Sequence, residues 1–313
     1  MGKKAFIFPG QGAQYIGMAM DFVKSNTELE NILKNFDDKN KTNLYDIMSE
    51  GPEEKLKDTK FTQPAILFHS IAALKTVLNE INIIPDYVAG HSLGEFSALV
   101  ANGVLTLEDA MYLVHKRGEF MIKANEGKPF AMAAIIGPSP DEVKAICEEA
   151  SKIDIVIAAN FNTPVQTVIS GSKAGVEKAC EIAQEREAKR VVPLVVGGPF
   201  HSPLIQKAAT WLSEEMDNIN FNKTNIPVVS NVNAKPVTDT DEIKNNLAKQ
   251  VTSSVLWVDS IKFMIEDGVD TFIEFGPKKV LAGMLKKIDK NVKVISIDTI
   301  ETFELVKNEL ETL

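Results

Sequence analysis

The sequence predicts an α/β protein in which a parallel-sheet body carries a smaller inserted subdomain. Towards both ends of the chain, short apolar runs alternate with segments of helical periodicity, as they do in parallel α/β sheets. In the middle, the segments follow the order β-α-β-β-α-β, which is that of a ferredoxin-like unit. The composition, 44% hydrophobic and 25% charged, is that of an ordinary globular protein.

The body is predicted from short apolar runs and from the amphipathic segments between them. The predicted strands are 5–8, 87–89, 226–229, 271–275 and 292–297. The predicted helices are 65–80, 93–101, 107–124, 203–217, 254–266, 280–288 and 302–310. In such a sheet, ligands bind outside the carboxyl ends of the strands.

The inserted subdomain is predicted to span 127–197, which leaves 1–126 and 198–313 as the discontinuous body. Glycine and proline punctuate both boundaries, as Gly127-Lys128-Pro129 and Gly197-Gly198-Pro199. Between them we expect strands at 130–136, 155–159, 167–170 and 190–196, and helices at 140–150 and 173–187. A cleft between the two parts is the expected ligand site.

Charge and hydropathy exclude several classes of protein. With 34 basic and 43 acidic residues the net charge is −9, a poor match for nucleic acid or an anionic membrane. The apolar run 5–8 stops at Pro9, and no run reaches the roughly 18 apolar residues of a spanning helix. Cys147 and Cys180 are too few for a disulfide framework. We therefore expect a soluble cytoplasmic protein without nucleic-acid or membrane partners.

The strongest chemical signal is Gly90-His91-Ser92-Leu93-Gly94, between a predicted strand and a predicted helix. This is the setting of a nucleophile elbow, where a serine stands on a tight turn at a helix N-terminus. Ser92 is the candidate nucleophile, and the amide of Leu93 would point at an oxyanion formed there. The alternative is a serine that only caps the helix.

A serine nucleophile needs a base, and His201 is the best placed of the four histidines. It follows a predicted strand in a loop, whereas His69 and His115 fall inside helices and His91 is expected to pack elsewhere. A loop histidine without a role is the alternative. No orienting acid is evident, so the orienting group is a backbone carbonyl or amide side chain, or there is no triad.

Two further features are unusual. The segment Gly10-Gln11-Gly12-Ala13-Gln14 lacks the third glycine of a dinucleotide fingerprint, so it is either a second oxyanion donor or a plain tight turn. Arg117, one of only three arginines with Arg186 and Arg190, lies on the apolar face of its helix. It either pairs with an internal Asp or Glu or binds a substrate carboxylate.

Together these segments resemble the malonyl-CoA:acyl-carrier-protein transacylases of bacterial fatty acid synthesis and the related acyltransferases of polyketide synthases. The resemblance covers essentially the whole chain. Its marks are 8–14, 90–95, Lys116-Arg117-Gly118, 158–171, 198–202, Ser230-Asn231-Val232, Gln250 seven residues before Trp257, and 274–281.

The resemblance implies an α/β-hydrolase-like body and a role for each matching residue. Ser92 would carry the malonyl ester, and His201 would act as base and then as acid. The amides of Gln11 and Leu93 would form the oxyanion hole, the backbone carbonyl of Gln250 would orient His201, and Arg117 would hold the malonate carboxylate. The implied substrate-binding residues also include Met121, Phe200, Asn160, Asn162 and Gln166.

The implied reaction is ping-pong malonyl transfer from malonyl-CoA to acyl carrier protein, with no metal or cofactor. In such enzymes, a phenylalanine at the position of Phe200 is associated with selection of malonyl over methylmalonyl groups. Two positions depart from the family pattern: Lys278 replaces a common glycine and Ser254 a common proline.

Alternative functions are a trans-acting polyketide acyltransferase, a serine esterase or thioesterase, and a noncatalytic carrier-docking module. The lysine-containing pairs 189–190, 278–279 and 286–287 are candidate docking sites, and a monomer is favoured.

Overall fold

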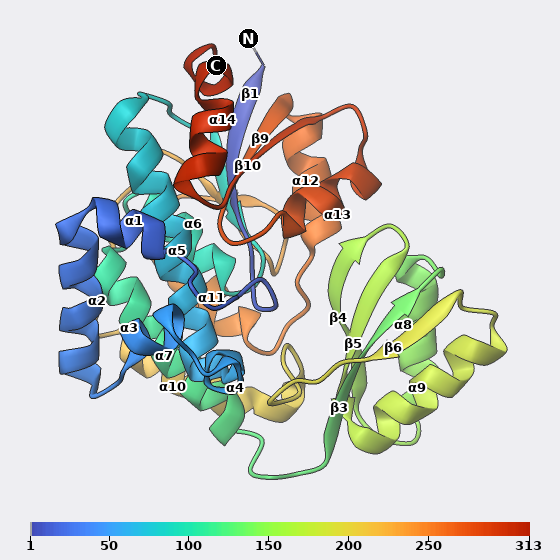
Figure 1. Ribbon diagram of the computed structural model, residues 1–313. Coiled ribbons are helices and arrows are strands. Elements are labelled where there is room, and N and C mark those ends of the chain that lie inside the picture. The colour runs from blue at the N-terminus through green and yellow to red at the C-terminus, as the bar shows by residue number, and fades with distance from the viewer. Residues whose placement is uncertain (1) are drawn as a thin grey trace.

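The computed structural model describes residues 2–313, whose strands form two separate sheets (Figure 1). The larger sheet has the strand order β10-β9-β1-β2-β7-β8, and the smaller has the order β4-β5-β3-β6. In Figure 1 the small sheet and its helices, in green and yellow, lie beside the body rather than within it. The predicted α/β fold class, with a parallel body and a small inserted unit, is confirmed.

The body sheet is parallel from β10 to β7, and its short edge strand β8 runs antiparallel to β7. Phe6 and Phe8 of β1 pack into the large core on one face, whereas Ala5 and Ile7 pack with Trp257 on the other. Helices therefore cover both faces, which explains why the strands read as continuous apolar runs. Its strands are β1 (Lys3–Phe8), β2 (Tyr87–Gly90), β7 (Val228–Val229), β8 (Pro236–Val237), β9 (Val269–Phe275) and β10 (Lys293–Ile297).

The body helices differ from prediction mainly near the N-terminus, where no helix was predicted before residue 65. Three of the four helices missed there have only five or six residues, too few to show a periodic apolar stripe. The body helices are α1 (Met20–Ser25), α2 (Thr27–Asn40), α3 (Leu44–Ser49), α4 (Glu53–Lys57), α5 (Thr59–Glu80), α6 (Gly94–Ala101), α7 (Leu107–Lys123), the 3₁₀ helix Pro203–Ile205, α10 (Gln206–Met216), α11 (Thr240–Gln250), α12 (Trp257–Glu266), α13 (Val280–Ile288) and α14 (Ile300–Glu311).

Helix α5 begins six residues before its predicted start and continues through Pro64. A proline inside a helix has no N–H to donate to the carbonyl four residues earlier, here that of Lys60. The imidazole of His115 on α7 supplies the missing bond, with Nδ1 at 3.0 Å from the Lys60 carbonyl oxygen. This bond gives His115 a structural role.

The small sheet consists of β3 (Phe130–Ile136), β4 (Val156–Thr163), β5 (Gln166–Ser172) and β6 (Arg190–Pro193), with α8 (Pro140–Ala150) and α9 (Lys173–Glu185). All four strands fall within the predicted span 127–197. Strand β5 lies between β3 and β4, and β3 lies between β5 and β6, so each β-α-β unit is split by a strand of the other. Strand β4 continues four residues beyond the predicted 155–159 and so includes Asn160 and Asn162.

The edge of β4 is joined to the body by backbone hydrogen bonds. The N–H of Val255 donates to the Ala159 carbonyl at 2.8 Å, and the N–H of Phe161 donates to the Val255 carbonyl at 3.0 Å. Ser254, which departs from the proline common in the resembling family, donates its Oγ to the Ala158 carbonyl at 2.7 Å. Because residues 254 and 255 are extended along β4, α12 begins at Trp257 and not at the predicted 254.

Within residues 2–313 no helix combines the length and the apolar character needed to cross a membrane.

Gly94 lies where α6 packs closely against the end of β1. A Cβ atom at this position would lie 2.2 Å from the Phe8 carbonyl oxygen and 2.9 Å from the Pro9 carbonyl oxygen. Real Cβ contacts are never this short, and both neighbours are backbone atoms that move only if the helix moves. Glycine at position 94 is therefore required for α6 to pack against the end of β1.

We expect Gly94→Ala to lower the free energy of unfolding by about 2 kcal/mol or more, because it overpacks a backbone contact. The matched control is Gly283→Ala inside α13, where an added Cβ meets nothing within 4 Å. That change should stabilise the protein by about 0.5–1 kcal/mol through helix propensity. Chemical denaturation of both variants measures the contrast, and equal effects would contradict this account.

Candidate active site

The turn between β2 and α6 holds Ser92 in a left-handed conformation, with φ of +53°. A Cβ at Gly90 would lie 1.9 Å from the backbone of Gly94, so both glycines are needed for the turn to close. A non-glycine residue in this conformation stores strain and persists only where its surroundings hold it firmly. The structure therefore has the strained strand–turn–helix geometry expected of a nucleophile elbow.

Ser92 and His201 are hydrogen-bonded, with Oγ 2.8 Å from Nε2. On the other side of the ring, His201 Nδ1 lies 2.8 Å from the backbone carbonyl oxygen of Gln250. Because a carbonyl only accepts, Nδ1 carries the proton and Nε2 is left to accept the proton of Ser92. The group that orients His201 is thus a carbonyl at the end of α11, which accounts for the absence of an evident acid.

His201 is buried, and it too has a left-handed backbone, with φ of +57°. Two effects lower the pKa of His201 to about 3: burial, which is the larger, and the positive charge of Arg117. The imidazole is therefore neutral at neutral pH, as a proton acceptor must be.

Arg117 enters the site from α7 and is only 1% exposed. Its NH1 donates to Gln63 Oε1 at 2.8 Å, and its NH2 donates to Gln250 Oε1 and Ser92 Oγ, each at 3.0 Å. Within residues 2–313 no Asp or Glu oxygen lies within 4.0 Å of its guanidinium, so Arg117 forms no direct ion pair, although the charge of Glu95 acts on it from further away. A buried cation solvated by neutral amides beside Ser92 can receive an anionic group.

Gln11 and Leu93 approach Ser92 from two different turns. Gln11 follows β1 in a turn that is closed by a bond from the Gly12 N–H to Gln14 Oε1 at 2.9 Å. In the part of the chain that is described, the backbone N–H groups of Gln11 and Leu93 have no hydrogen-bond partner. Two free amides at the end of the sheet can stabilise an oxyanion.

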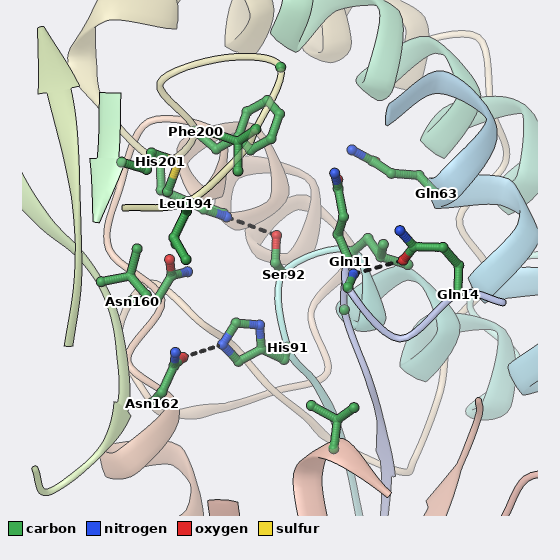
Figure 2. A pocket seen from close by; sticks show the side chains of 18 of the residues that line it. Gln11, Gln14, Gln63, His91, Ser92, Asn160, Asn162, Leu194, Phe200 and His201 are labelled. Carbon is green, nitrogen blue, oxygen red and sulfur yellow. Dashed lines mark hydrogen bonds between the residues drawn. The ribbon is translucent and has the colours of Figure 1, made fainter. Parts of the chain in front are cut away.

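A cavity of about 920 Å³ lies between the body and the small sheet. Figure 2 shows Asn160 and Asn162 on one side of Ser92, and Gln11 and Gln63 on the other. The sequence-predicted residues that line this cavity are Gln11, Ser92, Leu93, Arg117, Met121, Asn160, Asn162, Gln166, Phe200 and His201. Gln250 does not line it, because it is fully buried behind Ser92.

His91 differs from its prediction as a packing residue outside the site. Its side chain lines the cavity, and Nε2 lies 2.8 Å from Asn162 Oδ1 on β4 (Figure 2). The same ring packs edge-on against Trp257. His91 therefore links the elbow to the small sheet.

Sequence reasoning from the residues missed three polar side chains around Ser92. Gln63 contacts Arg117 from α5, and Asn231 accepts the Ser92 N–H at 2.8 Å while donating to the Gly90 carbonyl at 2.7 Å. Glu95, in the first turn of α6, contacts both Asn231 and Gln250. The available signal for Glu95 was a charged residue in a helix whose other side chains are small or apolar.

Lys278 lies in the loop after β9. Its φ of +64° is a left-handed conformation, which explains why glycine is common here in the resembling family. Its Nζ donates to the Gln14 carbonyl at 3.3 Å, so the departure ties this loop to the turn that carries Gln11.

Within residues 2–313 no group of three or more His, Cys, Asp or Glu side chains is arranged to hold a metal ion.

Comparison with known proteins gives consistent matches over nearly the whole chain. The family described as "Acyl transferase domain" matches residues 5–306. A relative named malonyl CoA-acyl carrier protein transacylase, from Bacillus subtilis, is 44% identical over 97% of this chain and 96% of its own length. The crystal structure of an acyl-carrier-protein S-malonyltransferase from Burkholderia pseudomallei has 39% identity and a TM-score of 0.93, covering 98% of this chain and 99% of that one.

A third match is the structure of a type II PKS acyl-carrier protein in complex with its malonyl-transacylase. It has 34% identity and a TM-score of 0.93, and covers 98% of this chain and 99% of that one.

We expect replacement of Arg117 by glutamine to raise the pKa of His201 towards the ordinary value of about 6.5, because it removes a nearby positive charge. The measurement is an NMR titration of the imidazole C–H signals in the wild type and in Arg117→Gln. His91 is the control, since burial lowers its pKa without a contribution from Arg117. An unchanged His201 midpoint would mean that Arg117 does not set it.

Proposed function

The chain belongs to the acyl transferase domain family, and on this premise we propose that it transfers malonyl groups from malonyl-CoA to acyl carrier protein in fatty acid biosynthesis. The names of its relatives support this substrate pair. The observation that carries the proposal is Arg117, a buried guanidinium with no carboxylate in contact and with NH2 3.0 Å from Ser92 Oγ. It is placed to bind the free carboxylate of an acyl group attached to Ser92.

In the first half-reaction, Ser92 Oγ attacks the thioester carbonyl carbon of malonyl-CoA while its proton passes to His201 Nε2. The amides of Gln11 and Leu93 stabilise the negative charge that develops on the carbonyl oxygen. The C–S bond breaks, and the leaving thiolate of coenzyme A takes the proton from His201. The product is a malonyl ester on Ser92, with His201 neutral again.

In the second half-reaction, the phosphopantetheine thiol of acyl carrier protein gives its proton to His201 and attacks the ester carbonyl. Ser92 Oγ leaves and takes the proton from His201, which completes a ping-pong cycle. Both steps are redox-neutral exchanges of an acyl group, so we propose that they require no metal or cofactor.

The electrostatics of the site favour an acyl group that carries its own negative charge. A bound malonate carboxylate offsets the charge of Arg117, one of the two main causes of the low pKa of His201. Proton acceptance by His201 is therefore easier with malonyl than with an uncharged acyl group. Met121, Phe200, Asn160, Asn162 and Gln166 line the same cavity and are the proposed substrate contacts, with Phe200 limiting the size of the group next to the carboxylate.

A carrier protein from a polyketide pathway is the second candidate acceptor, because one matching structure contains a type II PKS acyl-carrier protein. Transfer rates to carriers of the two pathways, measured with the same malonyl-enzyme, distinguish these acceptors. A serine esterase remains the alternative reaction. It predicts that the acyl-enzyme is hydrolysed as fast without a carrier as with one.

Incubation with malonyl-CoA should add one malonyl group to the intact protein, because Ser92 forms a covalent ester. Intact-mass spectrometry measures the adduct, and Ser92→Ala is expected to show none. A wild-type protein that acquires no adduct under turnover conditions would refute the proposed intermediate.

Arg117→Ala should reduce malonyl transfer by a factor of about 100 or more, as expected when one partner of a buried charged contact is lost. Acetyl transfer should fall by a much smaller factor, because acetate offers no carboxylate to Arg117. The measurement is the ratio of kcat/KM for malonyl-CoA to that for acetyl-CoA. Equal losses for the two substrates would contradict the proposed carboxylate site.

A further inference from the structure

Glu95 is a buried carboxyl group that the proposed reaction does not use. It lies in the first turn of α6, three residues after Ser92, and is 2% exposed. The other side chains of α6 are small or apolar. An ionisable group in such a place is destabilising unless its hydrogen bonds are satisfied.

The carboxyl of Glu95 accepts two hydrogen bonds through Oε2. Gln250 Nε2 donates to it at 2.7 Å, and the backbone N–H of Asn231 donates at 3.1 Å. Gln250 ends α11 and Asn231 follows β7, so Glu95 connects three segments that are far apart in the sequence.

The same two residues hold both backbone polar groups of Ser92. Asn231 Oδ1 accepts the Ser92 N–H at 2.8 Å, and Gln250 Nε2 donates to the Ser92 carbonyl at 3.0 Å. These bonds oppose relaxation of the left-handed backbone at Ser92. Loss of either bond would let the Oγ atom move relative to His201.

Glu95 also helps to set which way the side-chain amide of Gln250 points. Gln250 Oε1 accepts from Arg117 NH2 at 3.0 Å, while Nε2 faces Glu95. A guanidinium can only donate and a carboxylate can only accept, so this orientation is the one that satisfies both. Without the carboxylate, the amide keeps the Ser92 carbonyl as an acceptor but loses the shortest of the bonds that turn its oxygen towards Arg117.

We propose that Glu95 is a positioning residue for acyl transfer, which fixes Gln250 and Asn231 and through them both the Ser92 elbow and Arg117. This inference rests on the proposed function, in which Ser92 and Arg117 hold the acyl group. Burial raises the pKa of Glu95 to about 7, against the hydrogen bonds from Asn231 and Gln250 and the charge of Arg117. Assays near pH 8 therefore test the carboxylate form.

The test uses Glu95→Met, which keeps the length of the side chain but removes both acceptors, and Glu95→Gln, which keeps an acceptor oxygen but loses the charge. The first readout is the second-order rate constant for modification of Ser92 by a neutral fluorophosphonate. We expect losses of about 100-fold for Glu95→Met and about tenfold for Glu95→Gln, as for charged hydrogen bonds. The second readout is the malonyl-to-acetyl selectivity, which should fall in both variants because Gln250 then holds Arg117 less firmly.

A matched control separates positioning from general destabilisation. Glu274, at the end of β9, is another fully buried carboxyl, and it accepts from the N–H groups of Leu281 and Ala282 and from Ser296 Oγ. Glu274→Gln should lower the melting temperature but leave the modification rate of Ser92 in the folded protein within twofold of wild type. If Glu95→Met does not fold, Glu95→Gln is compared with this control alone.

A double-mutant cycle tests whether Glu95 acts through Asn231. Glu95→Gln combined with Asn231→Ala should be no more than about threefold slower than the slower single variant, because the two residues act as one unit. Losses that multiply would overturn the proposal, as would a wild-type rate in folded Glu95→Gln. The fluorophosphonate does not require malonyl transfer, so a failure of the proposed function is distinguished from a failure of this inference.

Discussion

The site depends on Gln250, which is fully buried and bonded through its backbone and through both ends of its side chain. Its carbonyl holds His201 Nδ1, its Oε1 accepts from Arg117, and its Nε2 donates to the Ser92 carbonyl and to Glu95. One residue thus sets the distances among the three side chains that the proposed reaction uses. Because each polar atom has a partner of fixed donor or acceptor character, the amide cannot rotate without breaking several bonds at once.

The buried charge of Arg117 explains why the net charge of −9 says little about the substrate. Neutral amides of Gln63 and Gln250 surround the guanidinium, which lowers the cost of burial without cancelling the charge. Arg186, by contrast, is paired with Glu149 on the surface. A buried charge that is left incompletely balanced beside the cavity acts on a ligand more strongly than the whole surface does.

The sequence predicted the fold class, the order of elements in the small sheet, and the turn that carries Ser92, because each has a local pattern. It did not predict α11, whose inner face is Ile243, Asn246, Leu247 and Gln250, so that polar residues interrupt the stripe that marks a buried helix. The group that orients His201 is a backbone carbonyl, which every residue has, so no residue type reveals it. Only the resemblance indicated its position in the sequence. The catalytic roles of these residues stay predictions, whereas membership of the family is established.

The backbone bridge between β4 and Val255 bears on how this architecture can be rearranged. The small unit is continuous in sequence and looks like a module that could be exchanged between relatives. Its edge strand, however, is hydrogen-bonded to the N–H and the carbonyl of Val255. This residue follows the carbonyl that orients His201 by five positions. A graft of residues 127–197 would have to reproduce the edge of β4 as well as the two chain junctions. Without that edge, the segment from Gln250 to Val255 would lose its hydrogen bonds to β4, and His201 would be held less firmly. The small unit and the body are therefore best exchanged together.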